Sequence, residues 1–416
     1  MNSAQRQTRP YDLIVFGATG FTGRLVAQYL LQAYGVGGLY AHEAPTWAIA
    51  GRSVAKLQSV RDLIDAPRDL PLITVDAQDA EALTAMARQA KVIVTTVGPY
   101  QLHGETLLKA CIAAGTDYVD LCGEPNWMAD MIGRHEAAAQ ASGARIVFSC
   151  GFDSIPFDLG VLHLQTQAHR IFGAPLREVQ GRVKVMKGGF SGGTAASLLA
   201  TLNAAGSNVA VAASMRNPFA LTPGFAGPAQ PDDSVAVFDE AANSWAGPFV
   251  MAAINTKNIH RTNALRGHAY GRDFTYDERQ STGPGRAGEL RARGMVSTAR
   301  WQNRLLGFGP TRKLIGRFLL PQPGDGPSLR ERESGGYELS FSGQSAEGQG
   351  LRTVVKGDRD PGYGSTCKLI AESALCLIRE VDRTVTPGGI WTPAAAMGTA
   401  LIARLHERAG LTFVTG

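Results

Sequence analysis

Cysteine pairs and long apolar runs are scarce in this sequence. Its five cysteines are an odd number and form no C-x-x-C pair, which argues against a disulfide framework and against a zinc site. One uncharged stretch, residues 188–215, is long enough to cross a bilayer, but glycine, serine, threonine and asparagine interrupt it throughout. We therefore predict a protein with no metal site and no transmembrane segment, in a reduced cytoplasmic setting.

Charge is also modest. Only 19% of the 416 residues are charged and the net charge is +5, a balance that suits an anionic cofactor or substrate. The sequence carries no nucleic-acid recognition motif, and residues 1–10 lack the apolar core of a signal peptide. The length and the apolar fraction of 44% predict a globular protein of two domains.

A glycine-rich turn near the start of the chain organises the rest. An apolar run at 11–16 is followed by Gly17, Gly20 and Gly23 and then by a helical pattern at 24–31. Glycines let the backbone turn sharply off a strand, and the positive end of the following helix can hold a pyrophosphate. The spacing is G-x-x-G-x-x-G, and in this strand and helix context it predicts a dinucleotide site rather than an ordinary turn. The residues expected to contact the phosphates are Gly17, Thr19, Gly20, Phe21, Thr22 and Gly23.

Strand-like and helix-like segments alternate through the first third of the chain. Mostly apolar, non-alternating strands separated by helices are typical of a parallel, doubly wound α/β sheet of Rossmann type. The six strands are expected at 11–16, 47–51, 72–76, 92–97, 118–121 and 145–148.

A second, mixed α+β domain is expected after residue 155. Alternating apolar and polar residues at 179–185, 337–341 and 351–355 predict antiparallel strands, the last two as a hairpin. Two further helices are expected at 365–383 and 394–408, with their packing left open. We accordingly divide the chain into a dinucleotide-binding Rossmann domain (1–155), a substrate domain (156–360) and C-terminal helices (361–416).

A basic segment covers residues 286–320. Eight arginines and lysines lie between 286 and 317 with a single acid, Glu289, and with aromatic and aliphatic residues among and just after them. Such a segment can contact a membrane surface or an acidic carrier, although a solvated basic helix packed on its own domain is the simpler interpretation.

The residues after the second strand favour NADPH over NADH. Arg52 stands where NAD sites carry a carboxylate for the ribose hydroxyls. We predict that Arg52 binds the 2′-phosphate with help from Ser53 and Lys56. Asp76, which ends the third strand, either contacts the adenine amino group or caps the next helix.

The fourth and sixth strand ends carry the candidate catalytic groups. Gly98 would permit close approach of the nicotinamide, Pro99 would stiffen the turn, and Tyr100 is the leading candidate for a polar group that faces the substrate. Asp153 either handles a proton or caps the following turn.

Several longer motifs carry a family resemblance. The chain resembles the saccharopine dehydrogenase-like oxidoreductases, and within them the branch of trans-acting enoyl reductases. The motifs that carry the resemblance are Gly17-Ala18-Thr19-Gly20-Phe21-Thr22-Gly23, Val97-Gly98-Pro99-Tyr100, Leu121-Cys122-Gly123-Glu124, Gly151-Phe152-Asp153-Ser154-Ile155-Pro156, Lys187-Gly188-Gly189-Phe190, Asp360-Pro361-Gly362-Tyr363-Gly364 and Trp391-Thr392-Pro393.

The resemblance implies an NADPH-linked reductase that acts on a carbon–carbon double bond of an acyl, lipid or polyketide-type substrate, free or bound to a carrier. A saccharopine-type dehydrogenase that joins an amino acid to a keto acid stays open as an alternative. So does a non-catalytic NADPH-binding regulator with peripheral contact to the inner face of the membrane. The oligomeric state is also open, a dimer included.

Overall fold

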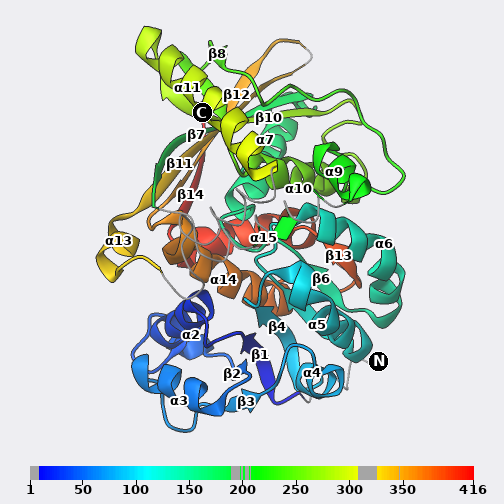
Figure 1. Cartoon of the computed structure of the whole chain (residues 1–416), viewed down its shortest axis with the longest axis vertical. Coiled ribbons are helices and arrows are strands. Elements are labelled where there is room, and N and C mark those ends of the chain that lie inside the picture. Colours follow the sequence, from blue (N-terminus) through cyan, green and yellow to red (C-terminus); the bar gives the residue numbers. More distant parts are fainter. Residues whose placement is uncertain are drawn as a thin grey trace.

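Two sheets with their covering helices form the molecule (Figure 1). The computed structural model describes residues 9–188, 208–307, 326–345 and 347–416, together with positions 197, 200, 201 and 206. The first sheet lies at the bottom of Figure 1, the second lies at the top, and the C-terminal helices lie between them. This arrangement confirms the predicted Rossmann-type sheet with a second mixed domain.

The first sheet is parallel and has the order β13-β6-β5-β4-β1-β2-β3. Because β1 pairs with both β2 and β4, the strand order reverses at β1, and the carboxyl edge beside it is where such sheets bind ligands. The six predicted strands are present, and a seventh joins from far along the chain. The strands are β1 (Tyr11–Phe16), β2 (Trp47–Gly51), β3 (Leu72–Thr74), β4 (Ala90–Thr95), β5 (Asp117–Val119), β6 (Arg145–Val147) and β13 (Gly389–Trp391).

Helices connect successive strands of this sheet. The first of them, α2, presents Gly23, Ala27, Leu30 and Tyr34 to the core at three- and four-residue spacing, which is why this segment forms a helix against the sheet. The connecting helices are α2 (Phe21–Tyr34), α3 (Val54–Leu63), α4 (Ala80–Ala87), α5 (Tyr100–Ala114) and α6 (Pro125–Ser142). From β6 the chain enters α7 (Ile155–Phe172), which packs on α10, β11 and β12 of the second domain.

The second sheet is mixed, with the order β14-β12-β11-β7-β10-β9-β8. Strands β7 and β10 are parallel and the other pairs are antiparallel. The predicted hairpin is confirmed, because Leu339 of β11 pairs with Val355 of β12. The strands are β7 (Glu178–Lys187), β8 (Val237–Asp239), β9 (Ser244–Pro248), β10 (Thr275–Gly283), β11 (Gly336–Gln344), β12 (Gly350–Gly357) and β14 (Leu411–Thr415).

The helices of the second domain are α9 (Val209–Arg216), α10 (Ala252–Leu265), α11 (Gly285–Gly307) and α13 (Leu329–Ser334). Within the described ranges, none combines the length and the apolar character that a bilayer crossing needs, and the same holds for the helices of the first domain.

The C-terminal segment returns to the first sheet, which answers a question that the sequence left open. After the turn η2 (Pro361–Ser365), helix α14 (Thr366–Arg379) packs on α2, β4 and β5, and α15 (Pro393–Arg408) packs on α14 and α7. Strand β13 then extends the first sheet and β14 extends the second. The same segment therefore belongs to both sheets.

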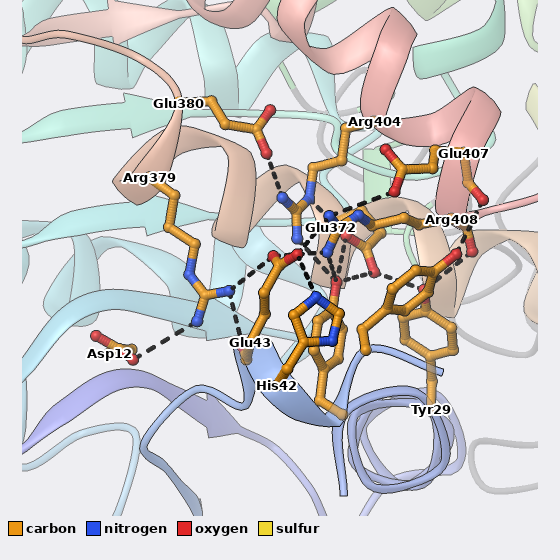
Figure 2. Close-up of polar contacts among 12 residues, drawn as sticks. Asp12, Tyr29, His42, Glu43, Glu372, Arg379, Glu380, Arg404, Glu407 and Arg408 are labelled. Atoms are coloured by element: carbon orange, nitrogen blue, oxygen red, sulfur yellow. Dashed lines mark hydrogen bonds and ion pairs between the residues drawn. The ribbon is translucent and has the colours of Figure 1, made fainter. Parts of the chain in front are cut away.

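A buried polar cluster fixes α14 and α15 to α2 (Figure 2). We call Tyr29, Tyr34, Glu372 and Arg404 the C-terminal clamp. The fully buried Glu372 carboxylate accepts hydrogen bonds from the hydroxyls of Tyr29 at 2.5 Å and Tyr34 at 2.8 Å. Arg404 pairs with the same carboxylate at 2.6 Å and donates to the Tyr34 hydroxyl at 2.8 Å. Burial and the charge of Glu372 raise the pKa of Tyr34 to about 12, so the hydroxyl keeps its proton.

Candidate functional site

The glycine turn after β1 is shaped by close backbone contacts. Gly17 has a φ of +91°, and a Cβ there would lie 2.7 Å from Val97 Cγ2. A Cβ on Gly23 would lie 2.3 Å from the carbonyl oxygen of Gly17. Both contacts are too short for any side chain, so these two glycines are required for the turn to pack against β4 and α2. Thr19 at the tip of the turn lies against Gly51, with 3.5 Å between its methyl group and the position of a Gly51 Cβ.

The first turn of α2 is open to an anion. Gly20 occupies the N-cap position, no side chain caps the helix, and its first turn contains no acid. The first intrahelical bond of this turn runs from the Arg24 N–H to the Gly20 carbonyl at 3.0 Å. The N–H groups of Phe21, Thr22 and Gly23 come before that bond in the chain and have no intrahelical acceptor. They point out of the helix at the positive end of its dipole.

The end of β2 presents a cation. Arg52 is exposed, and no hydrogen bond or ion pair of its side chain is found among the described residues. Ser53 is the N-cap of α3 and accepts a hydrogen bond from the Lys56 N–H at 3.4 Å, while the Lys56 side chain is exposed. Part of the predicted 2′-phosphate site is therefore a free guanidinium beside a helix N-terminus.

Asp76 does not cap the next helix. Its carboxylate accepts from the Gln78 N–H at 2.9 Å, and Asp79 is the N-cap of α4. The predicted contact of Asp76 with adenine stays a prediction.

Tyr100 begins α5 directly after the cis Gly98–Pro99 bond. Its hydroxyl donates to the Thr95 carbonyl at 3.2 Å and accepts from the Leu121 N–H at 3.0 Å, and the residue is buried. Burial and the nearby Asp120 raise the pKa of Tyr100 well above its ordinary value. As placed here, the phenol joins two strand ends, and its predicted contact with the substrate stays a prediction.

A buried carboxylate, which sequence reasoning did not assign, holds the start of α5. Glu124 accepts hydrogen bonds from the N–H groups of Tyr100 at 2.8 Å and Gln101 at 2.9 Å. It also accepts from the Ser197 hydroxyl at 2.6 Å. Since Ser197 follows the second-domain strand β7, this contact joins the second domain to the carboxyl edge of the first sheet.

Asp120 connects the ends of β5 and β6. Its carboxylate accepts from the N–H groups of Cys122 and Ser149, both at 2.9 Å, and from the Tyr118 hydroxyl at 2.9 Å. Burial raises the pKa of Asp120 to about 7. Burial likewise raises the pKa of the thiols of Cys122 and Cys150 well above the ordinary value, so neither is a thiolate at neutral pH.

Asp153 lies between β6 and α7, and its catalytic role stays a prediction. Ser154, not Asp153, is the N-cap of α7, so the turn-cap alternative for Asp153 is not observed. Burial raises the pKa of Asp153 to about 7, with no opposing hydrogen bond in the described part of the chain. The residue nevertheless keeps some exposed surface. A carboxyl whose pKa is raised toward neutrality by burial suits general acid–base chemistry.

A second buried carboxyl, that of Glu278, interacts electrostatically with Asp153. Glu278 of β10 is buried and accepts from the Asn255 amide at 2.8 Å and the Tyr276 hydroxyl at 2.7 Å. Burial raises the pKa of Glu278 to about 8, and the charge of Asp153 acts in the same direction. Asn258, one turn along α10 from Asn255, donates to the Ser154 hydroxyl at 2.7 Å. Sequence reasoning missed Glu278 and the polar residues of α10. The pattern that could have revealed them is the run of polar residues in α10, a helix that proves to be buried.

Comparisons with known proteins identify the family of this chain. The saccharopine dehydrogenase NADP-binding domain family matches residues 13–147. A trans-acting enoyl reductase of Mycobacterium ulcerans is 36% identical over 425 residues, covering 98% of this chain and 97% of that protein. One of Mycobacterium tuberculosis is 36% identical over 423 residues, covering 97% of each. The chain belongs to the saccharopine dehydrogenase-like oxidoreductases.

A solved structure agrees with the fold. Saccharopine dehydrogenase (L-Glu forming) of Saccharomyces cerevisiae covers 98% of this chain and 99% of its own, with a TM-score of 0.53 and 11% sequence identity. As a member of this oxidoreductase family, the protein is an enzyme that uses NADP(H).

The observed residues fit NADP(H). The turn at Gly17 and Gly23 has room only for glycine, the first turn of α2 is uncapped, and Arg52 is unpaired among the described residues. The glycine turn and the uncapped helix start suit a pyrophosphate, and the unpaired arginine suits a 2′-phosphate.

The described part of the basic segment forms α11, which packs on β9 and β10 of its own domain. Gly288, Ala292 and Val296 face inward at four-residue spacing, as the simpler interpretation of the segment predicts. Arginines at 286, 300 and 304 remain exposed. Residues 308–320 of the basic segment lie outside the described residues.

Proposed function

We propose that this oxidoreductase is an NADPH-dependent enoyl reductase that acts on an α,β-unsaturated acyl, lipid or polyketide-type thioester. The proposal is supported by the relatives named trans-acting enoyl reductase, which align with the chain over nearly its full length. The structural observation that carries it is Asp153, a carboxyl between β6 and α7 that accepts no hydrogen bond among the described residues and whose pKa is raised to about 7 by burial.

Asp153 would have one defined task in this reaction. When bound, NADPH supplies the hydride that saturates the β carbon. The α carbon then needs a proton, and protonated Asp153 can donate it because its carboxyl is bound to no other group in the described ranges. The phosphates would be held by Gly17, Gly20 and the first turn of α2, and the 2′-phosphate by Arg52.

The surroundings of Asp153 disfavour the saccharopine-type alternative. A substrate with several carboxylates requires arginine or lysine side chains nearby. Among the described residues, the groups that act most strongly on Glu278 are a tyrosine, an asparagine, Asp153 and Asp277, and the arginines beside them, Arg182 and Arg279, are already paired with Asp277. An uncharged enoyl group suits these surroundings better.

The direct test is NADPH oxidation by purified protein with two substrate panels, enoyl thioesters and pairs of an amino acid with a keto acid. Turnover on an enoyl thioester alone supports the proposal. Turnover on the second panel alone would replace it by the saccharopine-type reaction. Tight NADPH binding with no turnover on either panel would favour a regulatory protein.

Replacing Arg52 by Ala should weaken NADPH binding by about tenfold or more while NADH binding changes little, because only NADPH offers a phosphate to this guanidinium. Dissociation constants from titration of protein fluorescence with each cofactor measure this. Lys56→Ala, on the same helix start, is the matched control and should have a smaller effect. Equal losses for NADPH and NADH would contradict the assignment of Arg52.

We further propose that α11 binds the acidic carrier domain that presents the acyl chain. Its exposed face carries Arg286, Arg300 and Arg304 beside Trp301, which is 64% exposed. Complementary charge mainly raises the association rate, and an exposed aromatic residue among arginines is typical of a binding surface.

Reversing the charge at Arg300 and Arg304 (R300E with R304E) should raise KM for a carrier-bound substrate by about tenfold at low salt. The KM for a small thioester without a carrier should not change. Reversal at the exposed Arg88 of the first domain is the control. A change in KM for both substrates would contradict carrier binding at α11.

A further inference from the structure

The first residue of α2 is covered by the second domain. Phe21 packs edge-on against Tyr363 of η2, with 4.7 Å between ring centroids. A Cβ on Gly326 would lie 2.3 Å from the Phe21 ring, so the backbone at Gly326 contacts the ring directly. The guanidinium carbon of Arg332 on α13 lies 5.9 Å from the centroid of the same ring. The helix start that faces the pyrophosphate is thus shared between the two domains.

Hydrogen bonds of Asp360 hold α13 and η2 together. The Asp360 N–H donates to the Arg332 carbonyl at 3.1 Å. The Asp360 carboxylate accepts from the N–H groups of Tyr363 at 3.0 Å and Gly364 at 2.8 Å. Because Asp360 ties α13 to η2, Arg332 and Tyr363 are placed over Phe21 together.

The guanidinium of Arg332 has a donor without a partner. Its Nε is buried without a hydrogen-bond partner, and no ion pair of its side chain occurs within the described ranges. Asp360, whose charge interacts with that of Arg332, already binds two backbone N–H groups. The first turn of α2 contributes no acid either. A buried donor without a partner is costly, so a group that accepts from it would be favoured.

We propose that Arg332 binds the pyrophosphate of NADP(H) from the second domain, opposite the N–H groups of α2. A guanidinium presents several donors in a plane and is suited to bidentate contact with phosphate oxygens. Bound cofactor would then tie α13 and η2 to the start of α2, so both domains would hold the same pyrophosphate. The proposal depends on the nucleotide site alone, and failure of the enoyl thioester assay would leave it standing.

The test is cofactor binding by Arg332→Met, which keeps an apolar contact with Phe21 and removes the charge. We expect the dissociation constants of NADPH, NADH and ADP-ribose to rise by about tenfold or more, since all three carry the pyrophosphate. Adenosine 2′-monophosphate, which lacks the pyrophosphate, should bind as tightly as before. Arg332→Lys should recover part of the loss, and the salt dependence of ADP-ribose binding should be weaker for Arg332→Met than for the wild type.

Arg330→Met is the matched control, because Arg330 is exposed on the same short helix. Unchanged binding of all ligands by Arg332→Met would overturn the proposal. An equal loss of adenosine 2′-monophosphate binding would also overturn it, because that loss would indicate a general structural effect. An equal loss of dinucleotide binding in Arg330→Met would overturn it as well. If the wild type bound none of the dinucleotides, the cofactor assignment itself would fail together with this proposal.

Discussion

Replacing Asp153 by Asn should lower kcat for an enoyl thioester by about 100-fold or more, the usual contribution of a positioned general acid. The amide keeps the size of the side chain but cannot deliver a proton to the α carbon. The pKa of Asp153 is raised to about 7, so wild-type activity should fall as pH rises through about 7 and the acid loses its proton. Initial rates between pH 5 and pH 9, with saturating NADPH, measure both effects.

Tyr100→Phe is the informative comparison, because Tyr100 is the other predicted catalytic residue. Its hydroxyl is bound between the Thr95 carbonyl and the Leu121 N–H. We expect Tyr100→Phe to lower the free energy of unfolding by about 1–3 kcal/mol, since those buried groups lose a partner, and to leave the pH profile unchanged. Asp153→Asn should bind NADPH normally and lose the decline near pH 7. A hundredfold loss of kcat in Tyr100→Phe with an unaffected Asp153→Asn would reverse the two roles.

Replacing Arg404 by Met should lower the free energy of unfolding by about 3–5 kcal/mol, the typical cost of leaving one partner of a buried ion pair unpaired. Arg404 and Glu372 are 2% and 0% exposed, so solvent compensates little of the Glu372 charge once the guanidinium is gone. The hydroxyls of Tyr29 and Tyr34 would still bind the carboxylate, but neither carries a positive charge. Urea denaturation followed by circular dichroism, without cofactor, gives the free energy.

Two further variants separate charge from packing in the C-terminal clamp. Arg404→Met with Glu372→Gln should be more stable than Arg404→Met alone, because no buried charge is left without a partner. Arg379→Met is the control within the same region, since Arg379 and its partner Glu43 are 25% and 33% exposed and such pairs contribute about 1 kcal/mol or less. A double variant no more stable than Arg404→Met would show that packing, not charge, makes the clamp important.

The sequence predicted well what depends on neighbouring residues. The glycine turn, the six strand segments and the hairpin of the second sheet follow from local spacing, and the structure confirms them. Strand β13 was not predicted, because it is only three residues long and pairs with β6 about 240 residues earlier in the chain, a contact that no local pattern encodes.

The candidate site shows the same limit. The sequence placed Tyr100 and Asp153 at strand ends but could not show which one would be bound by backbone groups. The partners of Tyr100 come from β4 and the end of β5, and the N-cap position of α7 is taken by Ser154. Glu278 was missed because it belongs to a strand of the other domain, and only the fold brings it near Asp153.

The placement of β13 and β14 at the edges of different sheets has a consequence for synthesis on the ribosome. Until residues 389–391 emerge, β6 is an open edge of the first sheet, and until residues 411–415 emerge, β12 is an open edge of the second. A nascent chain therefore exposes the unpaired β6 edge over more than half of its translation and the β12 edge only near the end, and such edges recruit other chains. Variants shortened before residue 389 should accumulate as aggregates rather than as a free nucleotide-binding domain.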